Sequence, residues 1–409
     1  MQRTLMSAPD TFDKDYLWGF RRYQFLSFMM LGIVNPLLMP FFQSRGMDKA
    51  QVGWLMAVLG LTALVVPPVW GLASDSARDR RIPLLAAIVG AAAAFLGFFL
   101  CHSFLALLGV MLLFGATFKA IIPLGIGLTF AWAEPAGRDY SRIRMFGSAG
   151  YVVALLLMWA PLHLWRDRIQ VVFPCFLVFA AAAAAGLLFL PKIAGTGHRR
   201  LDWHALKLLG RPAFAVTVAC TFVAQAAIGA HYTFFSQYVE DVFGIAKRYI
   251  VFFWAFGSVV ETAMYTQLGR LLRRFGTKWV LTAGMAGIAL RLGIYALVPS
   301  WPVIFLVQGF HALTFGAVHA STVTFVNYAA PTRWRQSAQT LFEGITIGLG
   351  MSLGALAGGY IARQWGYPTL FGCASAAAAL ACVVYAVFGR PASLAREPEE
   401  SPGEGLAEQ

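Results

Sequence analysis

The chain has 409 residues, of which 59% are apolar and only 12% are charged, and its formal net charge is +13. A soluble domain carries roughly 25% charged residues, so this chain has more apolar surface than a soluble fold can bury. The composition excludes a soluble enzyme, a disordered protein and a secreted disulfide scaffold, and it predicts an all-helical membrane protein.

Apolar stretches of the length needed to cross a bilayer, about 20 residues, recur along the chain. We expect twelve membrane helices, with cores at 23–42, 52–73, 82–101, 104–132, 146–163, 170–190, 212–235, 249–268, 279–298, 302–327, 338–362 and 367–388. The longest polar interruption follows the sixth stretch. This pattern predicts a six-helix bundle at 1–190, a cytoplasmic linker at 191–211, a second six-helix bundle at 212–389 and a disordered acidic tail at 390–409.

Basic residues are distributed unevenly between alternate loops. When the N-terminus is placed in the cytoplasm, most of the 32 Lys and Arg residues fall in cytoplasmic segments. The positive-inside rule therefore predicts a multi-pass protein of the plasma membrane, such as a bacterial inner membrane, with both termini in the cytoplasm. The same bias explains the basic net charge without a nucleic-acid partner.

Two loops carry related motifs. Residues 71–81 (GLASDSARDRR) follow the second apolar stretch, and residues 269–278 (GRLLRRFGTK) follow the eighth. Both resemble the glycine-, aspartate- and arginine-rich loop of the major facilitator superfamily. The first copy keeps the aspartate, Asp75, but lacks the second glycine, whereas the second keeps both glycines and has Arg273 at the aspartate position. One copy in each half of the chain indicates an internal repeat.

Further resemblance lies in residues 35–47 (NPLLMPFFQSRGM), 139–151 (DYSRIRMFGSAGY) and 258–319. These segments resemble the 3-phenylpropionate permease and lactose permease-like branch of the superfamily. The resemblance implies twelve helices in two pseudo-symmetric bundles, alternating access around a site near mid-membrane, and proton-coupled symport. No catalytic, ATP-binding or metal-binding motif is present in the sequence. We therefore expect a transporter without enzymatic activity, cofactor or metal, and a monomer.

Three ionisable residues fall at similar depth on successive predicted helices: Glu261, Arg291 and His311. A charge inside the membrane costs several kcal/mol unless it has a partner or faces a cavity. A glutamate balanced between burial and a nearby arginine can load and release a proton at working pH. By resemblance to the permease branch, we assign these three residues to proton coupling, with His319 as a weaker candidate. A static structural ion pair is the alternative.

Lys119 lies inside the fourth predicted helix, a position that lines the cavity in this superfamily. A lysine there favours an anionic substrate. The alternative is a salt bridge to Glu343, at the start of the eleventh helix, which would act as a gate. Asp75 and Arg274, in the two loop motifs, are further gate candidates on the cytoplasmic face.

Polar and aromatic residues on the cavity-lining helices complete the predicted substrate site. Besides Lys119 and His311, the candidates are Tyr23, Asn35, Tyr232, Gln308 and Phe315, with Asn327 as a weaker one. Stacking on a planar ligand is the functional interpretation of the aromatic residues. Packing in the core or against lipid is the alternative for each of them.

These residues together predict proton-coupled symport of a small organic solute, most simply a carboxylate, aromatic carboxylates included. Two other transport functions remain open. The first is import of a neutral sugar or nucleoside, with Lys119 acting only as a gate. The second is proton-driven efflux, although the Gly/Pro-rich signature of such antiporters is missing from the fifth predicted helix. A non-transporting receptor on the same fold is a fourth possibility.

Overall fold

The computed structural model describes residues 16–195, 197, 203–331 and 334–391, and throughout these ranges the regular structure is helical. The helices are α1 (Leu17–Ser44), α2 (Lys49–Ser76), α3 (Arg81–Leu100), α4 (Phe104–Ala133), α5 (Tyr140–Leu164), α6 (Val172–Gly186), α7 (Pro212–Phe243), α8 (Lys247–Leu297), α9 (Trp301–Val307), α10 (Val318–Ala329), α11 (Arg335–Glu343) and α12 (Met351–Phe388). Most of the tail predicted at 390–409 lies outside the described residues.

Among the described residues, ten helical segments are long and apolar enough to span a membrane, and one of them, Arg335–Phe388, has 54 residues, enough for two crossings. It turns at Gly366, whose φ of 83° is a backbone conformation that glycine adopts readily. The helix α8 turns in the same way at Gly276, where φ is 74°, and so holds the eighth and ninth crossings. The twelve crossings predicted from the sequence are confirmed.

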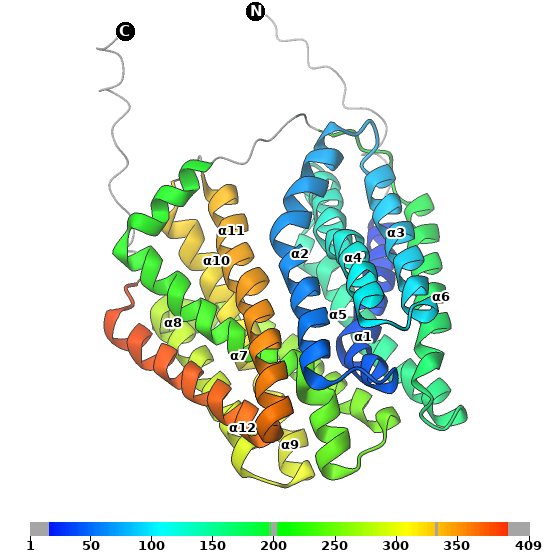
Figure 1. The fold of residues 1–409 in the computed structure, drawn as a ribbon. Coiled ribbons are helices and arrows are strands. Elements are labelled where there is room, and N and C mark those ends of the chain that lie inside the picture. Colours follow the sequence, from blue (N-terminus) through cyan, green and yellow to red (C-terminus); the bar gives the residue numbers. More distant parts are fainter. Residues whose placement is uncertain (1–15, 196, 198–202, 332–333, 392–409) are drawn as a thin grey trace, which may run out of the picture.

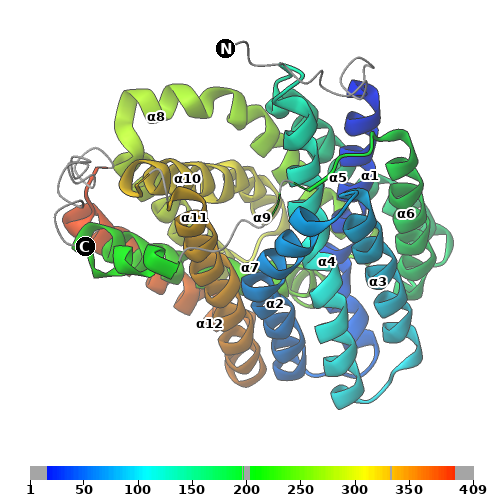
Figure 2. The same cartoon turned by 90° about the horizontal axis from the view of Figure 1, so that it is seen from above.

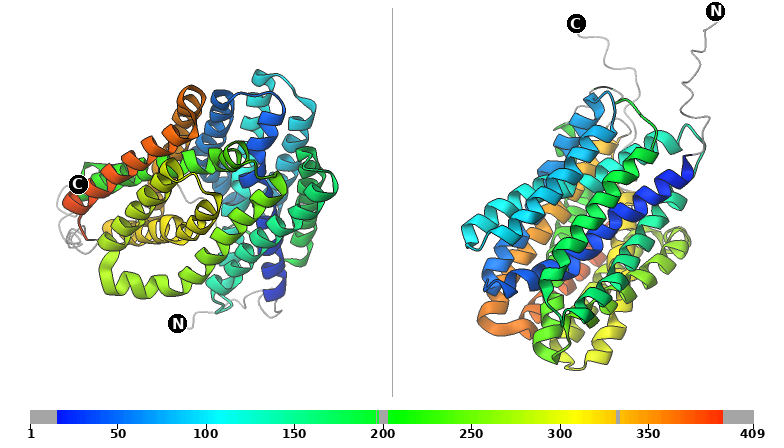
Figure 3. Two further views of the ribbon diagram at one scale, coloured as in Figure 1. Left: turned by 90° about the horizontal axis from the view of Figure 1, so that it is seen from below. Right: turned by 90° about the vertical axis from the view of Figure 1, so that its right-hand side faces the viewer.

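Two groups of helices lie side by side, α1 to α6 from blue to green and α7 to α12 from green to red (Figure 1). We call the face at the top of Figure 1, where residues 190–195 and 203–211 lie, the linker face. The opposite face, with the turns at 45–48 and 298–300, is the far face. Figure 2 looks down on the linker face, and Figure 3 shows the far face and a side view.

Close backbone packing joins the two groups toward the far face. There, α2 lies against α12, and a Cβ atom added at Gly53 would be only 2.7 Å from the carbonyl oxygen of Ala355. A Cβ added at Gly359 would be 2.6 Å from the carbonyl oxygen of Lys49. Any larger side chain at either glycine would push the groups apart.

Polar contacts reinforce the same junction at the far face. The Asp48 carboxylate pairs with Arg363 at 3.3 Å, and the Trp54 indole N–H donates to the Tyr360 hydroxyl at 3.0 Å. In both pairs one residue comes from α1–α6 and the other from α7–α12. The two halves are therefore bound to each other by specific contacts at the far face.

The tenth crossing is irregular, whereas the sequence predicted an unbroken helix at 302–327. It runs from α9 through a 3₁₀ turn at Gln308–Phe310 and a π-helical segment at Ala312–Ala317 into α10. The seventh helix is also longer than predicted and extends to Phe243. Because π-helical segments occur frequently at functional sites, the irregular crossing marks a region to examine for function.

Candidate functional site

Arg291, on the second arm of α8, is the centre of a buried polar network and is only 1% exposed. A guanidinium group has five N–H donors, and in this structure each has an acceptor. The Nε atom donates to Tyr295 Oη at 2.8 Å. One terminal nitrogen donates to His311 Nδ1 at 3.3 Å and to Thr314 Oγ1 at 3.2 Å. The other terminal nitrogen donates to His231 Nε2 at 3.0 Å and to Gln308 Oε1. The buried charge is therefore solvated by neutral side chains.

Irregular helix geometry brings three of these acceptors to one side of the tenth crossing. Gln308, His311 and Thr314 are spaced by three residues, and in a regular α-helix positions six apart lie about 120° from each other. A 3₁₀ turn has three residues per turn, so that positions three apart eclipse. The 3₁₀ turn at 308–310 therefore accounts for the shared direction of Gln308 and His311. Thr314 lies in the π-helical segment after it, and one terminal nitrogen of Arg291 reaches both His311 and Thr314.

The charge of Arg291 also fixes the protonation of two histidines. Because a guanidinium group can only donate, Nδ1 of His311 and Nε2 of His231 must accept, and each ring carries its proton on the other nitrogen. The Nε2 atom of His311 then lies 3.2 Å from Oε2 of Glu261 and 3.4 Å from the Tyr232 hydroxyl. Arg291 and Glu261 are thus linked through a neutral imidazole.

The helix α5, from the other half of the protein, reaches the same region. It packs against α8, and its Tyr151 lies near enough to Glu261 to sense the charge of that carboxylate. Tyr151 also interacts with the side chain of Asn35 on α1. Tyr151 therefore connects Asn35, a predicted substrate contact, to the surroundings of Glu261 from the other half of the protein.

Sequence reasoning missed several members of this site, including Tyr295, which accepts from Nε of Arg291, as well as His231 and Tyr151. His231 is 1% exposed and packs among the rings of Tyr232, Phe235, Trp254 and Tyr295. It falls inside the predicted seventh helix, and a full count of histidines in apolar stretches would have found it. Tyr151 ends one of the quoted motifs, but nothing in its local sequence identifies it as a partner of Glu261.

Other predicted residues lie around this network or apart from it. Phe315 stacks between His311 and His319, with 5.8 Å between ring centroids on each side, so His319 is joined to the network by stacking. Tyr23 is buried against α4, where a Cβ added at Gly125 would lie 2.7 Å from its ring. Lys119 is half-buried, and among the described side chains it forms no hydrogen bond or ion pair.

The gate candidates engage other partners in this structure. The Glu343 carboxylate accepts from Gln339 at 2.7 Å, and Asp75 pairs with Arg80 at 2.7 Å inside its own loop. The guanidinium of Arg274 lies over the ring of Phe275 at 5.2 Å. Within the described ranges, neither the Lys119–Glu343 pair nor an Asp75–Arg274 pair is formed, and both gates stay predictions.

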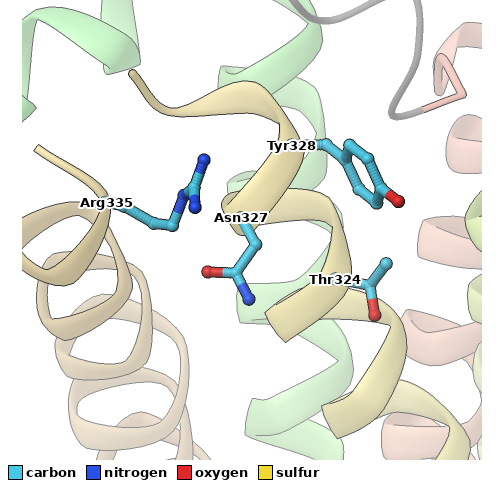
Figure 4. A pocket seen from close by; sticks show the side chains of 4 residues that line it. All are labelled: Thr324, Asn327, Tyr328 and Arg335. Atoms are coloured by element: carbon cyan, nitrogen blue, oxygen red, sulfur yellow. The ribbon is translucent and has the colours of Figure 1, made fainter. Parts of the chain in front are cut away.

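The last candidate, Asn327, lies away from Arg291. It lines a pocket of about 330 Å³ near the linker-face end of α10, together with Thr324, Tyr328 and Arg335 (Figure 4). Figure 4 shows the Arg335 side chain reaching toward Asn327 from the start of α11.

The fold, with its two groups of helices and a buried polar network in the second group, defines the class of protein as a secondary transporter of the major facilitator type. Residues 17–372 match the model of the MFS_1 like family, and the chain belongs to this family. It is therefore a multi-pass membrane transporter of a small molecule and not an enzyme.

Individual relatives agree with this class. The chain is 28% identical over 361 residues to the maltose permease of Geobacillus stearothermophilus, covering 86% of this chain and 90% of that protein. It is 25% identical over 316 residues to the probable 3-phenylpropionic acid transporter of Escherichia coli (strain K12), covering 74% of this chain and 80% of that protein. The crystal structure of the nucleoside transporter NupG superposes with a TM-score of 0.74 at 20% identity, covering 92% of this chain and 99% of that one.

Proposed function

We propose that this protein is a proton-coupled symporter and that Glu261 carries the coupled proton. The observation that carries the proposal is the chain of contacts from Arg291 through His311 to Glu261. Glu261 lies at the junction of α8 with α5, where its side chain is 15% exposed. It is the acid of the network, and it is reached by groups from both halves.

The hydrogen bond from Arg291 to His311 favours Glu261 as the site of the coupled proton. An imidazole whose Nδ1 atom accepts from Arg291 has no free lone pair there, and it cannot become an imidazolium without losing that hydrogen bond. A second cation beside Arg291 would also be repelled. His311 therefore donates from Nε2, and Glu261 is the group that would exchange the coupled proton.

Protonation of Glu261 would permit the two halves to move. A bare carboxylate at a closing junction loses water and is costly to bury, whereas a protonated one is not charged. Tyr151 on the opposite half is close enough to this carboxylate to be affected by its charge. The junction of α5 and α8 is therefore the place where proton loading would be coupled to the rocking of one half against the other.

The substrate we propose is a small organic carboxylate, aromatic carboxylates included, with Lys119 as its cationic contact. Lys119 lies in an apolar helix and lacks a hydrogen-bond or ion-pair partner in the part of the chain that the structure describes. A substrate carboxylate would supply that partner. The probable 3-phenylpropionic acid transporter among the relatives supports this substrate class.

A second candidate substrate is a neutral sugar or nucleoside, and a specific observation favours it. All five donors of Arg291 are occupied by the protein itself, so this residue offers nothing to a carboxylate in the observed state. The relatives named as a maltose permease and as nucleoside transporters support the same class. Competition of uptake by carboxylates separates the two candidates, because only a carboxylate carrier would be inhibited.

We further propose that the linker face is cytoplasmic, in a bacterial inner membrane, with both termini inside. The basic loops support this orientation. The contacts of Asp48 with Arg363 and of Trp54 with Tyr360 would then close the outer side. The conformation would be inward-facing, and the separation of Lys119 from Glu343 is consistent with an open inner gate.

Solute-induced proton movement in proteoliposomes tests the proposal, with aromatic acids, sugars and nucleosides as solutes. The wild type is compared with Glu261→Gln, which keeps the shape but not the charge. The control is Glu240→Gln, the same chemical change at a residue that pairs with Lys247 near the far face. We expect external alkalinisation with one solute class, lost in Glu261→Gln while exchange of that solute persists, and retained in the control. Proton movement that survives in Glu261→Gln would refute the role of Glu261, and acidification instead would indicate efflux by antiport.

A further inference from the structure

The pocket at the linker-face end of α10 is separate from the Arg291 network. Thr324, Asn327 and Tyr328 line it from α10, and Arg335 lines it from the first position of α11 (Figure 4). Thr324 is five residues after His319, the nearest member of the network along the chain, which is about 7.5 Å at 1.5 Å per helical residue. None of the described lining residues contacts Arg291, so a molecule in this pocket would touch a different set of side chains.

All four lining side chains are polar, and together they carry one positive charge. A hydroxyl, a carboxamide and a phenol can each donate a hydrogen bond, and the guanidinium can only donate. Glu343, two turns further along the same crossing, is held by Gln339 at 2.7 Å. The part of the lining that the structure describes is thus rich in donors and contains no acidic residue.

Arg335 is not neutralised by the described residues. No ion pair links it to any acid within the described ranges, and its Nε atom is buried without a hydrogen-bond partner there. A buried donor that has lost water and gained no acceptor is costly. A ligand with several oxygen acceptors would remove this cost.

The start of α11 adds to the positive potential. Its N-cap residue, Trp334, provides no side-chain hydrogen bond to the first turn. The first backbone N–H groups of a helix attract negative charge, and here they lie beside the guanidinium of Arg335. The donor-rich pocket, Arg335 (unpaired among the described residues) and the start of α11 all favour a negatively charged ligand.

We propose that this pocket binds an oxyanion, a phosphate or a carboxylate group, with Arg335 as the principal contact. The planar fork of the guanidinium fits two oxygens of such a group, and Asn327 and Thr324 supply further donors. The group would come either from an anionic phospholipid in the adjacent leaflet or from a soluble anion at the linker face. A volume of about 330 Å³ admits a headgroup or a small organic acid.

Ligand-induced stabilisation of the purified full-length protein in a neutral detergent tests the proposal. The probes are phosphatidylglycerol, phosphatidylcholine, inorganic phosphate and benzoate, each titrated while thermal unfolding is followed. The variants are Arg335→Gln, which removes the cation, and Asn327→Leu, which fills the exposed side of the pocket with an apolar group. The matched control is Lys207→Gln, which removes an exposed cation at the same face outside the pocket.

We expect an anionic probe to stabilise the wild type and the control alike, with an affinity about tenfold or more weaker in the two pocket variants. Stabilisation by phosphatidylglycerol but not phosphatidylcholine would identify a lipid source, and stabilisation by phosphate or benzoate a soluble one. Equal affinity in the wild type and Arg335→Gln, or no response to any anion, would overturn the proposal. Arg335→Lys keeps the charge and should recover part of the affinity if Arg335→Gln is correctly folded.

Because the measurement is binding and not transport, it is independent of the coupling role of Glu261. The variant Glu261→Gln should bind the same anion with wild-type affinity. Loss of binding in that variant would place the anion in the central site and would also overturn the pocket assignment.

Discussion

Asp167 offers the sharpest test of how the far face is held closed. It lies in the turn after α5, and its Oδ1 atom accepts from the backbone N–H of Arg248, at the start of α8, at 2.9 Å. Its Oδ2 atom lies 3.6 Å from the Arg248 guanidinium. The N-cap of α8 is Ala246, which has no capping side chain, so a residue of one half caps a helix of the other.

The backbone around Asp167 supports this role. Arg166 and Asp167 have φ values of 52° and 61°, in the left-handed region that residues other than glycine rarely occupy. Such conformations cost about 1 to 3 kcal/mol each and persist only when the surroundings hold them. The cap to Arg248 is one interaction that does so, and it exists only while the two halves meet.

The expected effect of Asp167→Ala can be estimated from these contacts. Loss of a capping oxygen costs about 1 kcal/mol, and a partly exposed ion pair contributes up to about 1 kcal/mol. Both are lost only from the state that is closed at the far face. The equilibrium should therefore shift by about 1.5 kcal/mol, or roughly tenfold, toward opening at that face.

Thiol accessibility measures this shift. The five native cysteines are replaced, Asn35→Cys is introduced beside the site, and its alkylation by a membrane-impermeant maleimide is timed from the far face. Asp167→Ala should raise the rate about tenfold, and Asp167→Asn, which keeps an oxygen acceptor without the charge, should raise it less. An unchanged rate in Asp167→Ala would refute the view that the cross-half cap holds this face closed.

Three further predictions follow from other contacts. His231→Leu should lower thermal stability by about 1 to 3 kcal/mol, because one Arg291 donor loses its acceptor, whereas His231→Gln should retain most of the stability. Gly359→Val should raise far-face alkylation and reduce uptake, because its Cβ would lie 2.6 Å from the Lys49 carbonyl oxygen. Burial opposes the ionisation of Asp79, but its hydrogen bonds with Arg81 hold its pKa below the usual value. The ionised form of Asp79 therefore stabilises the fold near neutral pH. The wild type should have a higher unfolding temperature than Asp79→Asn near neutral pH, and this difference should shrink below about pH 4 as Asp79 becomes protonated.

The fold could be predicted from the sequence because the lipid bilayer restricts which structures can cross it. Every crossing must be a long apolar helix, so the number and order of crossings could be read from the chain. Charged residues inside those helices are conspicuous for the same reason. Glu261, Arg291 and His311 were found in this way, and the structure brings them into one network.

The arrangement inside the network could not be predicted, since it depends on local helix geometry and on packing between distant segments. A uniform 100° per residue would leave Gln308 and His311 about 60° apart, whereas the 3₁₀ turn between them aligns their side chains. Tyr151 reaches Glu261 only because α5 packs on α8. A pairing of Lys119 with Glu343 would depend on which face is open, and a sequence does not specify one state of an alternating carrier.

The tautomer of His311 leads to the most discriminating test of the coupling scheme. Glutamine at this position can accept from Arg291 through its oxygen and donate to Glu261 through its amide nitrogen, as the neutral imidazole does. If the proton resides on Glu261, His311→Gln should keep proton-coupled uptake with the same pH midpoint, while His311→Leu should lose coupling, since Arg291 and Glu261 would each lose a partner. If the proton resides on the imidazole instead, both variants should lose coupling, because an amide does not titrate in this range. Solute-driven proton uptake measured in proteoliposomes between pH 5 and pH 8 distinguishes the two outcomes. Loss of coupling in His311→Gln would refute the assignment of the coupled proton to Glu261.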